Sequence, residues 1–295
     1  MPVHCKQFMK AIIQILVIIF SFIQIGFSQS QTYLLKKSYK KNSIEMLTQF
    51  FENWANEIPS NEASVVNDTI QEAYRVFKGF YRPTQISLLG GSEWEDSIYL
   101  NAKYFVVQTE IGKIQFADKV YFTQAEKDSI IISRISNIHK NDTTMRELWI
   151  QNYRKGKLDI ADELFESDSI VISSNNIIDI CSSPVFRPPI SYNDKKAVYL
   201  TSEYSKIINK FLGNTHYREF SMKKKEFLDN IIITFYGNWR GWQIYTYPYV
   251  YSITFDRNMQ YARVDYIIVY GGGNAILEKQ GDKWIIVYGE RTWIE

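Results

Sequence analysis

The strongest structural constraint in this chain is the alternation of short apolar segments and turn residues in its C-terminal part. Segments rich in β-branched and aromatic residues cover 249–255, 261–270, 275–279 and 284–289. The groups between them are Asp256-Arg257-Asn258, Gly271-Gly272-Gly273-Asn274 and Gln280-Gly281-Asp282-Lys283. Short glycine- and asparagine-containing groups between such segments are typical of hairpins. We therefore expect an antiparallel meander here.

Helical spacing marks the first part of the chain after residue 42. In the stretch 43–58, apolar residues recur at three- and four-residue steps, as expected for one buried helix face: Ile44, Leu47, Phe50, Phe51 and Trp54. A second helix is expected from Ile70 to Tyr81, between the capping residues Asn67-Asp68-Thr69 and Pro83. We expect the two helices to form a hairpin.

The pattern then changes to short β-rich segments. The strands that we expect lie at 85–89, 97–108, 113–116, 119–123, 129–133 and 169–173. Residues 137–157 are polar and match neither pattern, although Met145, Leu148 and Trp149 could form a helical turn. We predict an α+β N-terminal domain over 42–183, with an antiparallel sheet.

A proline-containing segment follows and is expected to be a linker. Residues 184–195 include Arg187-Pro188-Pro189, which favours an extended spacer. Beyond it, apolar spacing predicts a helix that ends at Gly213, and then a second helix over 221–232. These helices and the meander would form a C-terminal domain over 196–295.

The N-terminus has the features of an export signal. Lys6 and Lys10 precede an apolar stretch over 11–27, and Gly26 and Ser28 are the small residues expected before a cut. We predict a signal peptide over 1–28, a flexible polar tether over 29–41, and a periplasmic, secreted or cell-surface protein. The alternative is an uncleaved signal, which would attach the chain to a membrane.

Charge and cysteine content narrow the function classes. The chain has 34 basic and 32 acidic residues, and loss of Lys6 and Lys10 makes these numbers equal. A neutral chain without a long basic segment argues against nucleic acid as a partner. Cys181 is the one cysteine outside the signal, so an intrachain disulfide is excluded and stability must come from an apolar core.

The text of the C-terminal part resembles a known fold family. The stretch ARVDYIIVYGGGNAILEKQGDKWIIV, preceded by two helices, is similar to the end of the cone of NTF2-like domains. The segments FFENW, VFRPPISY and ERTWIE also resemble uncharacterised exported proteins of Bacteroidetes. The resemblance implies an NTF2-like cone over 196–295. It implies no activity, because that fold hosts enzymes, binding modules and scaffolds.

Few residues suggest catalysis. His139 and His216 are far apart in the sequence, and Cys181 lies among isoleucines, so we expect no metal site, no cofactor and no activated thiol. No catalytic motif with a recognised spacing occurs. Asp265 and Glu278 remain candidates for a carboxylate pair that faces across the last hairpins, as glycosidases require. Surface charges explain the two residues equally well.

A dense aromatic cluster is the leading candidate for a ligand site. It consists of Trp239, Arg240, Trp242, Tyr245, Tyr247, Tyr249 and Tyr251. Alternation in a strand would place the four tyrosines on one face, where their rings could stack on sugars or line a pocket. The alternative is that these rings pack beneath the helices as core.

An Asp-Ser/Thr pair recurs five times before the expected linker. It resembles the O-glycosylation signal of exported Bacteroidetes proteins, which implies the acceptors Thr69, Ser97, Ser129, Thr143 and Ser169. The alternative is local, because Asp-Ser and Asp-Thr also suit turns and helix caps.

These observations predict an exported, non-catalytic binding or scaffold protein whose partner is a small molecule, a glycan or an envelope protein. Two alternatives stay open: a hydrolase or isomerase that uses carboxylates in an NTF2-like cavity, and a structural subunit of a surface assembly.

Overall fold

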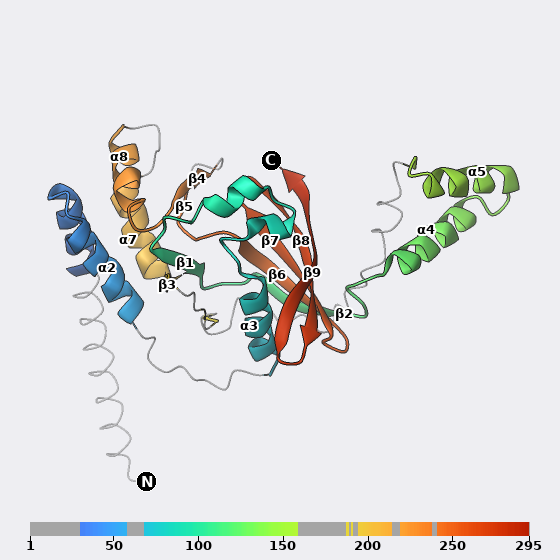
Figure 1. Ribbon diagram of the computed structural model, residues 1–295, viewed down its shortest axis with the longest axis horizontal. Helices are drawn as coiled ribbons and strands as arrows, with labels where there is room; N and C mark the ends of the chain where they lie inside the picture. The colour runs from blue at the N-terminus through green and yellow to red at the C-terminus, as the bar shows by residue number, and fades with distance from the viewer. Residues whose placement is uncertain are drawn as a thin grey trace, which may run out of the picture. The chain divides into compact units, whose positions relative to one another are not determined.

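The chain folds into two compact units built from alternating segments (Figure 1). The computed structural model describes residues 30–57, 68–158, 187–188, 190, 194–213, 219–237 and 241–294. Unit 1 comprises Met1–Ser64, Trp94–Thr109 and Pro189–Tyr249, and unit 2 comprises Val65–Glu93, Glu110–Pro188 and Val250–Glu295. Each unit is therefore discontinuous in sequence and is described by itself below.

This division differs from the expected succession of domains over 42–183 and 196–295. The reason is strand pairing over long sequence distances. In unit 1, β1 (Tyr104–Gln108) pairs in parallel with β3 (Lys196–Leu200). In unit 2, β2 (Lys113–Ala117) pairs in parallel with β6 (Tyr249–Asp256). The fold is mixed α+β, but its pairing is not wholly antiparallel.

Unit 2 is built on a five-stranded mixed sheet with the order β2-β6-β7-β8-β9. Its remaining strands are β7 (Tyr261–Ile268), β8 (Gly271–Gln280) and β9 (Lys283–Ile294). Strands β7, β8 and β9 pair antiparallel in succession, which confirms the expected meander. The β8–β9 turn is Gly281-Asp282, as predicted, with Gly281 at φ 63°.

The expected turn at Gly271–Asn274 is wrong. These residues form the start of β8, and the chain turns at Val269-Tyr270, because Ile268 pairs with Gly271. Close packing against β9 explains the glycine at position 273. A Cβ at Gly273 would lie 1.9 Å from the carbonyl oxygen of Glu290, so only glycine lets β8 and β9 approach this closely.

Helix α3 (Asp68–Phe80) covers β8 and β9, and its apolar face packs on the sheet (Figure 1). Glu72 on this helix is nearly buried and accepts hydrogen bonds from Trp284 Nε1 at 3.0 Å and Lys279 Nζ at 3.1 Å. Burial raises the pKa of Glu72, but the bonds from Trp284, Lys279 and Arg75 outweigh it and hold the pKa below its ordinary value. This carboxylate therefore ties the helix to the last hairpin.

Three expected strands in this region are not strands. Residues 86–89 form the 3₁₀ helix η1 (Ile86–Leu89), whose Leu89 carbonyl accepts a hydrogen bond from Tyr266. Residues 119–123 have no regular structure, and 129–133 lie inside α4 (Gln124–Ile138). A capping box of Thr123 and Glu126 starts α4, and Ile131 and Ile135 are buried at helical spacing. The unassigned polar segment contains α5 (Thr143–Arg154).

Unit 1 contains α2 (Ile44–Asn56), α7 (Ser202–Leu212), α8 (Glu219–Leu228) and the short pair β4 (Phe235–Gly237) and β5 (Gly241–Gln243). The structure confirms helices at all three sites where they were expected, and α7 ends at Gly213 as predicted. Trp54 of α2 stacks on Tyr204 of α7 at 4.2 Å and donates a hydrogen bond to the Tyr199 carbonyl. The core of this unit lies between these helices.

Two further expectations differ from the structure. Helices α2 and α3 belong to different units, so the predicted N-terminal hairpin is not one structural element. The strand expected over 97–108 shortens to β1, because η2 (Glu93–Ser97) and turns take its first part.

The predicted flexible tether over 29–41 is also wrong. Residues 30–40 are helical, and Leu35 and Ser38 are buried in unit 1. Their spacing places them on one helix face, which the high lysine content of the segment obscured. Among the described residues, no helix is long and apolar enough to cross a membrane.

Candidate binding groove at the sheet edge

Two residues of the predicted aromatic site, Tyr247 and Trp242, are buried. Tyr247 is fully buried, its ring lies 5.7 Å from that of Phe235, and its amide donates to the Tyr99 hydroxyl at 3.0 Å. Trp242 is nearly buried and donates from Nε1 to the Gly213 carbonyl at 2.7 Å. Both side chains therefore contribute to the core of unit 1. Trp239 and Arg240 lie outside the described residues.

The remaining tyrosines do not form the expected row on one strand. Residues 244–248 are not in a strand, and β6 begins only at Tyr249. Tyr245 and Tyr249 are half-buried with ring centroids 4.6 Å apart, and burial raises the pKa of Tyr245. Tyr251 is exposed and belongs to unit 2. The structure thus brings the rings of Tyr245, Tyr247 and Tyr249 together, and Tyr251 follows Tyr249 two residues later on β6.

The two candidate carboxylates do not face each other. Asp265 pairs with Asn274, and Glu278 pairs with Tyr261, four positions further along the same ladder. At about 3.3 Å per residue they are roughly 13 Å apart, beyond the roughly 5–9.5 Å that separates glycosidase carboxylates. They also project from the face opposite Val264 and Tyr266, the face on which Tyr266 meets Phe80 of α3.

Each carboxylate has local partners instead. Asp265 accepts hydrogen bonds from Ser252 and from Arg263 Nε, the latter at 2.8 Å. Hydrogen bonds from Gln280 and Tyr261 hold the pKa of Glu278 below its ordinary value. The lowered pKa of Glu278 favours its ionised form, which does not suit the role of a general acid.

The remaining sequence candidates are dispersed. Ser97, Ser129 and Thr143 are exposed, Thr69 is half-buried, and Ser169, Cys181 and His216 lie outside the described residues. His139 ends α4 and contacts the Trp149 ring at 4.5 Å. Within the described parts of the chain, no group of three His, Cys, Asp or Glu side chains could hold a metal ion.

The local explanation of the Asp-Ser/Thr pairs holds at one position. Asp142 Oδ1 accepts from the amide of Met145 at 3.0 Å and so caps α5. At a second position the role is different. Asp128 accepts from the Tyr153 hydroxyl at 2.6 Å and so joins α4 to α5.

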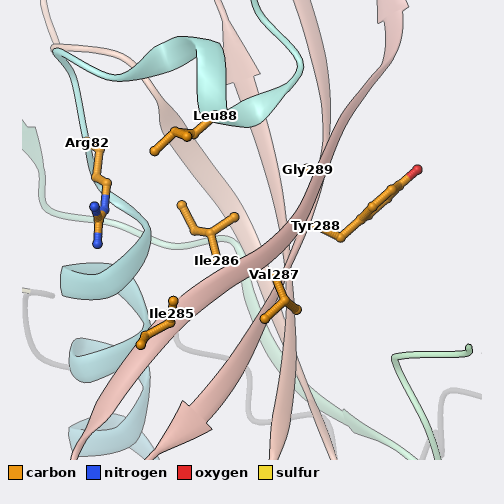
Figure 2. A pocket seen from close by; sticks show the side chains of 7 residues that line it. All are labelled: Arg82, Leu88, Ile285, Ile286, Val287, Tyr288 and Gly289. Atoms are coloured by element: carbon orange, nitrogen blue, oxygen red, sulfur yellow. The ribbon is translucent and has the colours of Figure 1, made fainter.

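A groove in unit 2, which the sequence analysis did not single out, is a further candidate site. Its volume is about 410 Å³, and it is lined by Arg82, Leu88, Ile285, Ile286, Val287, Tyr288 and Gly289. Figure 2 shows Leu88 and Ile286 facing each other, with Arg82 beside them. The exposed fractions of Leu88 (50%), Val287 (44%), Tyr288 (40%) and Ile285 (37%) are high for apolar side chains.

The shape of the groove follows from the backbone of β9, the edge strand of the sheet. The pairing register shifts at Ile276/Leu277, where Ile276 pairs with Tyr288 and Leu277 pairs with Ile286. Val287 is thus the extra residue of a β-bulge. A Cβ at Gly289 would lie 2.7 Å from the Leu88 carbonyl, so this glycine lets η1 close against the strand. The β-bulge at Val287 and the close approach of η1 at Gly289 together shape the apolar wall of the groove.

Charges of both signs lie at the groove, since the hydroxyl of its Tyr288 donates a hydrogen bond to the Glu290 carboxylate. Arg82 is the charged residue among those lining it, and its guanidinium donates to the Gly79 carbonyl and to Gln85, both at 3.2 Å. Lys127 Nζ lies 5.6 Å from the centre of the Tyr288 ring. Apart from Arg82 and the Tyr288 hydroxyl, the described side chains that line the groove are apolar. The arrangement therefore suits apolar binding beside a guanidinium.

The sequence contained one signal for this site. The stretch WIIVYG was assigned to a strand, but its four apolar residues from Ile285 to Tyr288 do not alternate with polar ones. Such a segment indicates either a strand buried on both faces or an exposed apolar edge. Only the strand order distinguishes the two. No family model, curated protein or solved structure matches the chain.

Proposed function

We propose that this chain is an exported, non-catalytic binding or scaffold protein that holds an extended segment of an envelope protein in the groove at β9. The observation that carries the proposal is the exposed apolar edge from Ile285 to Tyr288, which forms one wall of the groove. Extended peptides bind sheet edges through backbone hydrogen bonds, and neighbouring apolar pockets give side-chain selectivity.

The proposal includes an NTF2-like arrangement, which the resemblance implied for 196–295 and which we now propose for the sheet of unit 2. Its support is one helix, α3, packed on consecutive antiparallel strands, with register shifts at Gly272/Gly273 and Ile276/Leu277. Shifts of this kind bend and twist a sheet. The parallel strand β2 at the other edge is an addition to that arrangement.

The test is a substitution in the groove. Val287→Lys places a charge where an apolar ligand would pack, and the exposed position should tolerate it with little loss of stability. Leu148→Lys, an equally exposed apolar residue on α5, is the matched control. We expect Val287→Lys alone to lose the proteins that co-purify from the native envelope. Equal recovery with both variants would contradict the proposal.

A small molecule or glycan at the aromatic cluster remains a second form of the proposal. Its support is the close pair of half-buried rings, Tyr245 and Tyr249. Thermal shift with glycan and metabolite panels tests it. We expect Tyr249→Ala to remove the shift while Tyr251→Ala does not, and this form fails if no compound shifts the wild-type protein.

No observation favours the hydrolase or isomerase alternative, because Asp265 and Glu278 are far apart and each is engaged locally. The structural-subunit alternative has one support, the exposed Ile138, Met145 and Leu148 of α4 and α5. Glycosylation at Ser97, Ser129 and Thr143 is consistent with their exposure. Mass spectrometry of peptides from exported protein tests it directly.

A further inference from the structure

The helix formed by residues 30–40 is held rigidly in unit 1 by one face. Gln31, Leu35 and Ser38 are buried on that face. The Tyr39 ring contacts Phe211 of α7 at 5.6 Å and Phe227 of α8 at 5.4 Å, both edge-on. The orientation of this helix on α7 and α8 is therefore fixed.

The opposite face combines lysines with one aromatic ring. Tyr33, Lys36, Lys37 and Lys40 recur at steps of three and four residues, so they form one stripe along the helix. Tyr33 is 62% exposed, and Lys37 Nζ lies 5.3 Å from the centre of its ring. No acidic residue occurs from Ser30 to Lys41. The stripe is thus cationic and amphipathic.

Helix α8 extends this positive surface. Its Lys224 lies close enough to Lys36 for the two charges to repel, and burial together with that repulsion lowers the pKa of Lys224. Lys223 and Met222 beside it are exposed. Glu226 of α8 is also exposed, so the described side chains named here are five lysines on two helices against one acid.

We propose that this face, formed by Tyr33, Lys36, Lys37 and Lys40, binds the anionic headgroups of a phospholipid bilayer. Each lysine at such a surface contributes about fivefold to affinity at low salt, and tyrosine is enriched at the membrane–water interface. The position in the chain also favours a membrane. The face begins shortly after the apolar stretch 11–27, the predicted export signal, which would direct the chain to one. The proposal is independent of the groove.

The experiment uses the protein as it is exported, purified from its native envelope, and measures co-sedimentation with two kinds of vesicle. One kind is pure phosphatidylcholine, and the other contains 30 mol% phosphatidylglycerol. We expect binding only to the anionic vesicles, with loss at high salt. Lys36→Gln/Lys40→Gln should weaken it about 25-fold, since each lysine contributes about fivefold. The matched control is Lys155→Gln/Lys157→Gln, two exposed lysines after α5.

Every other outcome overturns the proposal. Equal binding to both kinds of vesicle would mean attachment through apolar residues, and no binding would exclude the surface. If the Lys36→Gln/Lys40→Gln variant bound vesicles like the wild type, the charges that bind the lipid would lie outside this face. Binding to soluble polyphosphate is measured as well, to distinguish recognition of a lipid surface from binding to any polyanion. We expect Tyr33→Ala to weaken vesicle binding and to leave polyphosphate binding unchanged, and equal affinity of the wild type for both would contradict a lipid surface.

Discussion

At the scale of single residues, the sheet of unit 2 depends on positions where no side chain fits. Gly273 is the clearest case, because a Cβ there would lie 1.9 Å from the Glu290 carbonyl oxygen. We expect Gly273→Ala to destabilise unit 2 by about 1–3 kcal/mol, the usual cost of overpacking. Gly241→Ala is the control, since nothing lies within 4 Å of its Cβ. Thermal unfolding measures both, and equal midpoints would contradict the strand register.

The carboxylate of Glu72 gives a prediction about pH. Its pKa is lowered in the folded state, so it contributes stability that is present above its ordinary pKa, near 4.5, and is lost as the pH falls through the folded value. We expect Glu72→Gln to unfold at lower temperature at neutral pH and to show less further loss between about pH 5 and pH 2.

The control for this prediction is Glu147→Gln, at an exposed position on α5. It should keep the full acid dependence of the wild type. If the Glu72→Gln variant also kept the acid dependence of the wild type, the hydrogen bonds to the Glu72 carboxylate would not determine the acid stability of unit 2.

At the scale of elements, the helix caps account for structure that apolar spacing did not predict. Helix α5 has no buried residue, and its start is fixed by the bond from the Met145 amide to Asp142. Removing such a cap costs about 1 kcal/mol. We expect Asp142→Ala to speed hydrogen exchange of the first α5 amides about fivefold. Asn141→Ala, one residue earlier, should leave their exchange unchanged, and unchanged exchange in both would contradict the cap.

Helices α2, α3 and α7 were predictable because each has an apolar face with helical spacing, and α7 has a clear end signal at Gly213. Isolated β-rich segments were not. Residues 129–133 read as a strand because isoleucine favours strands, but the capping box at Thr123 places them in a helix. The glycines at 271–273 suggested a turn, although they start β8 and Gly273 allows close packing against β9.

At the scale of the whole molecule, long-range strand pairing determines which segments form each unit, and the sequence patterns did not predict this. β1 pairs with β3 and β2 pairs with β6, so strands far apart in the chain are joined. The apolar pattern of a single segment does not show which distant segment it pairs with. The candidate site follows the same rule. For the aromatic cluster, a ligand surface and packing beneath the helices were both open, and the burial of Trp242 and Tyr247 supports packing for these two residues. The groove appears only once β9 is known to be an edge strand.

The most direct test of the groove is site-specific photocrosslinking in the producing cell. A photoreactive residue at Val287 lies in the groove, and one at Leu148 lies on an exposed apolar surface outside it. We expect Val287 alone to crosslink to one defined extended segment, which as a synthetic peptide binds the purified wild type and not Val287→Lys. Identical adducts from both positions, or a peptide that binds both proteins equally, would contradict the account.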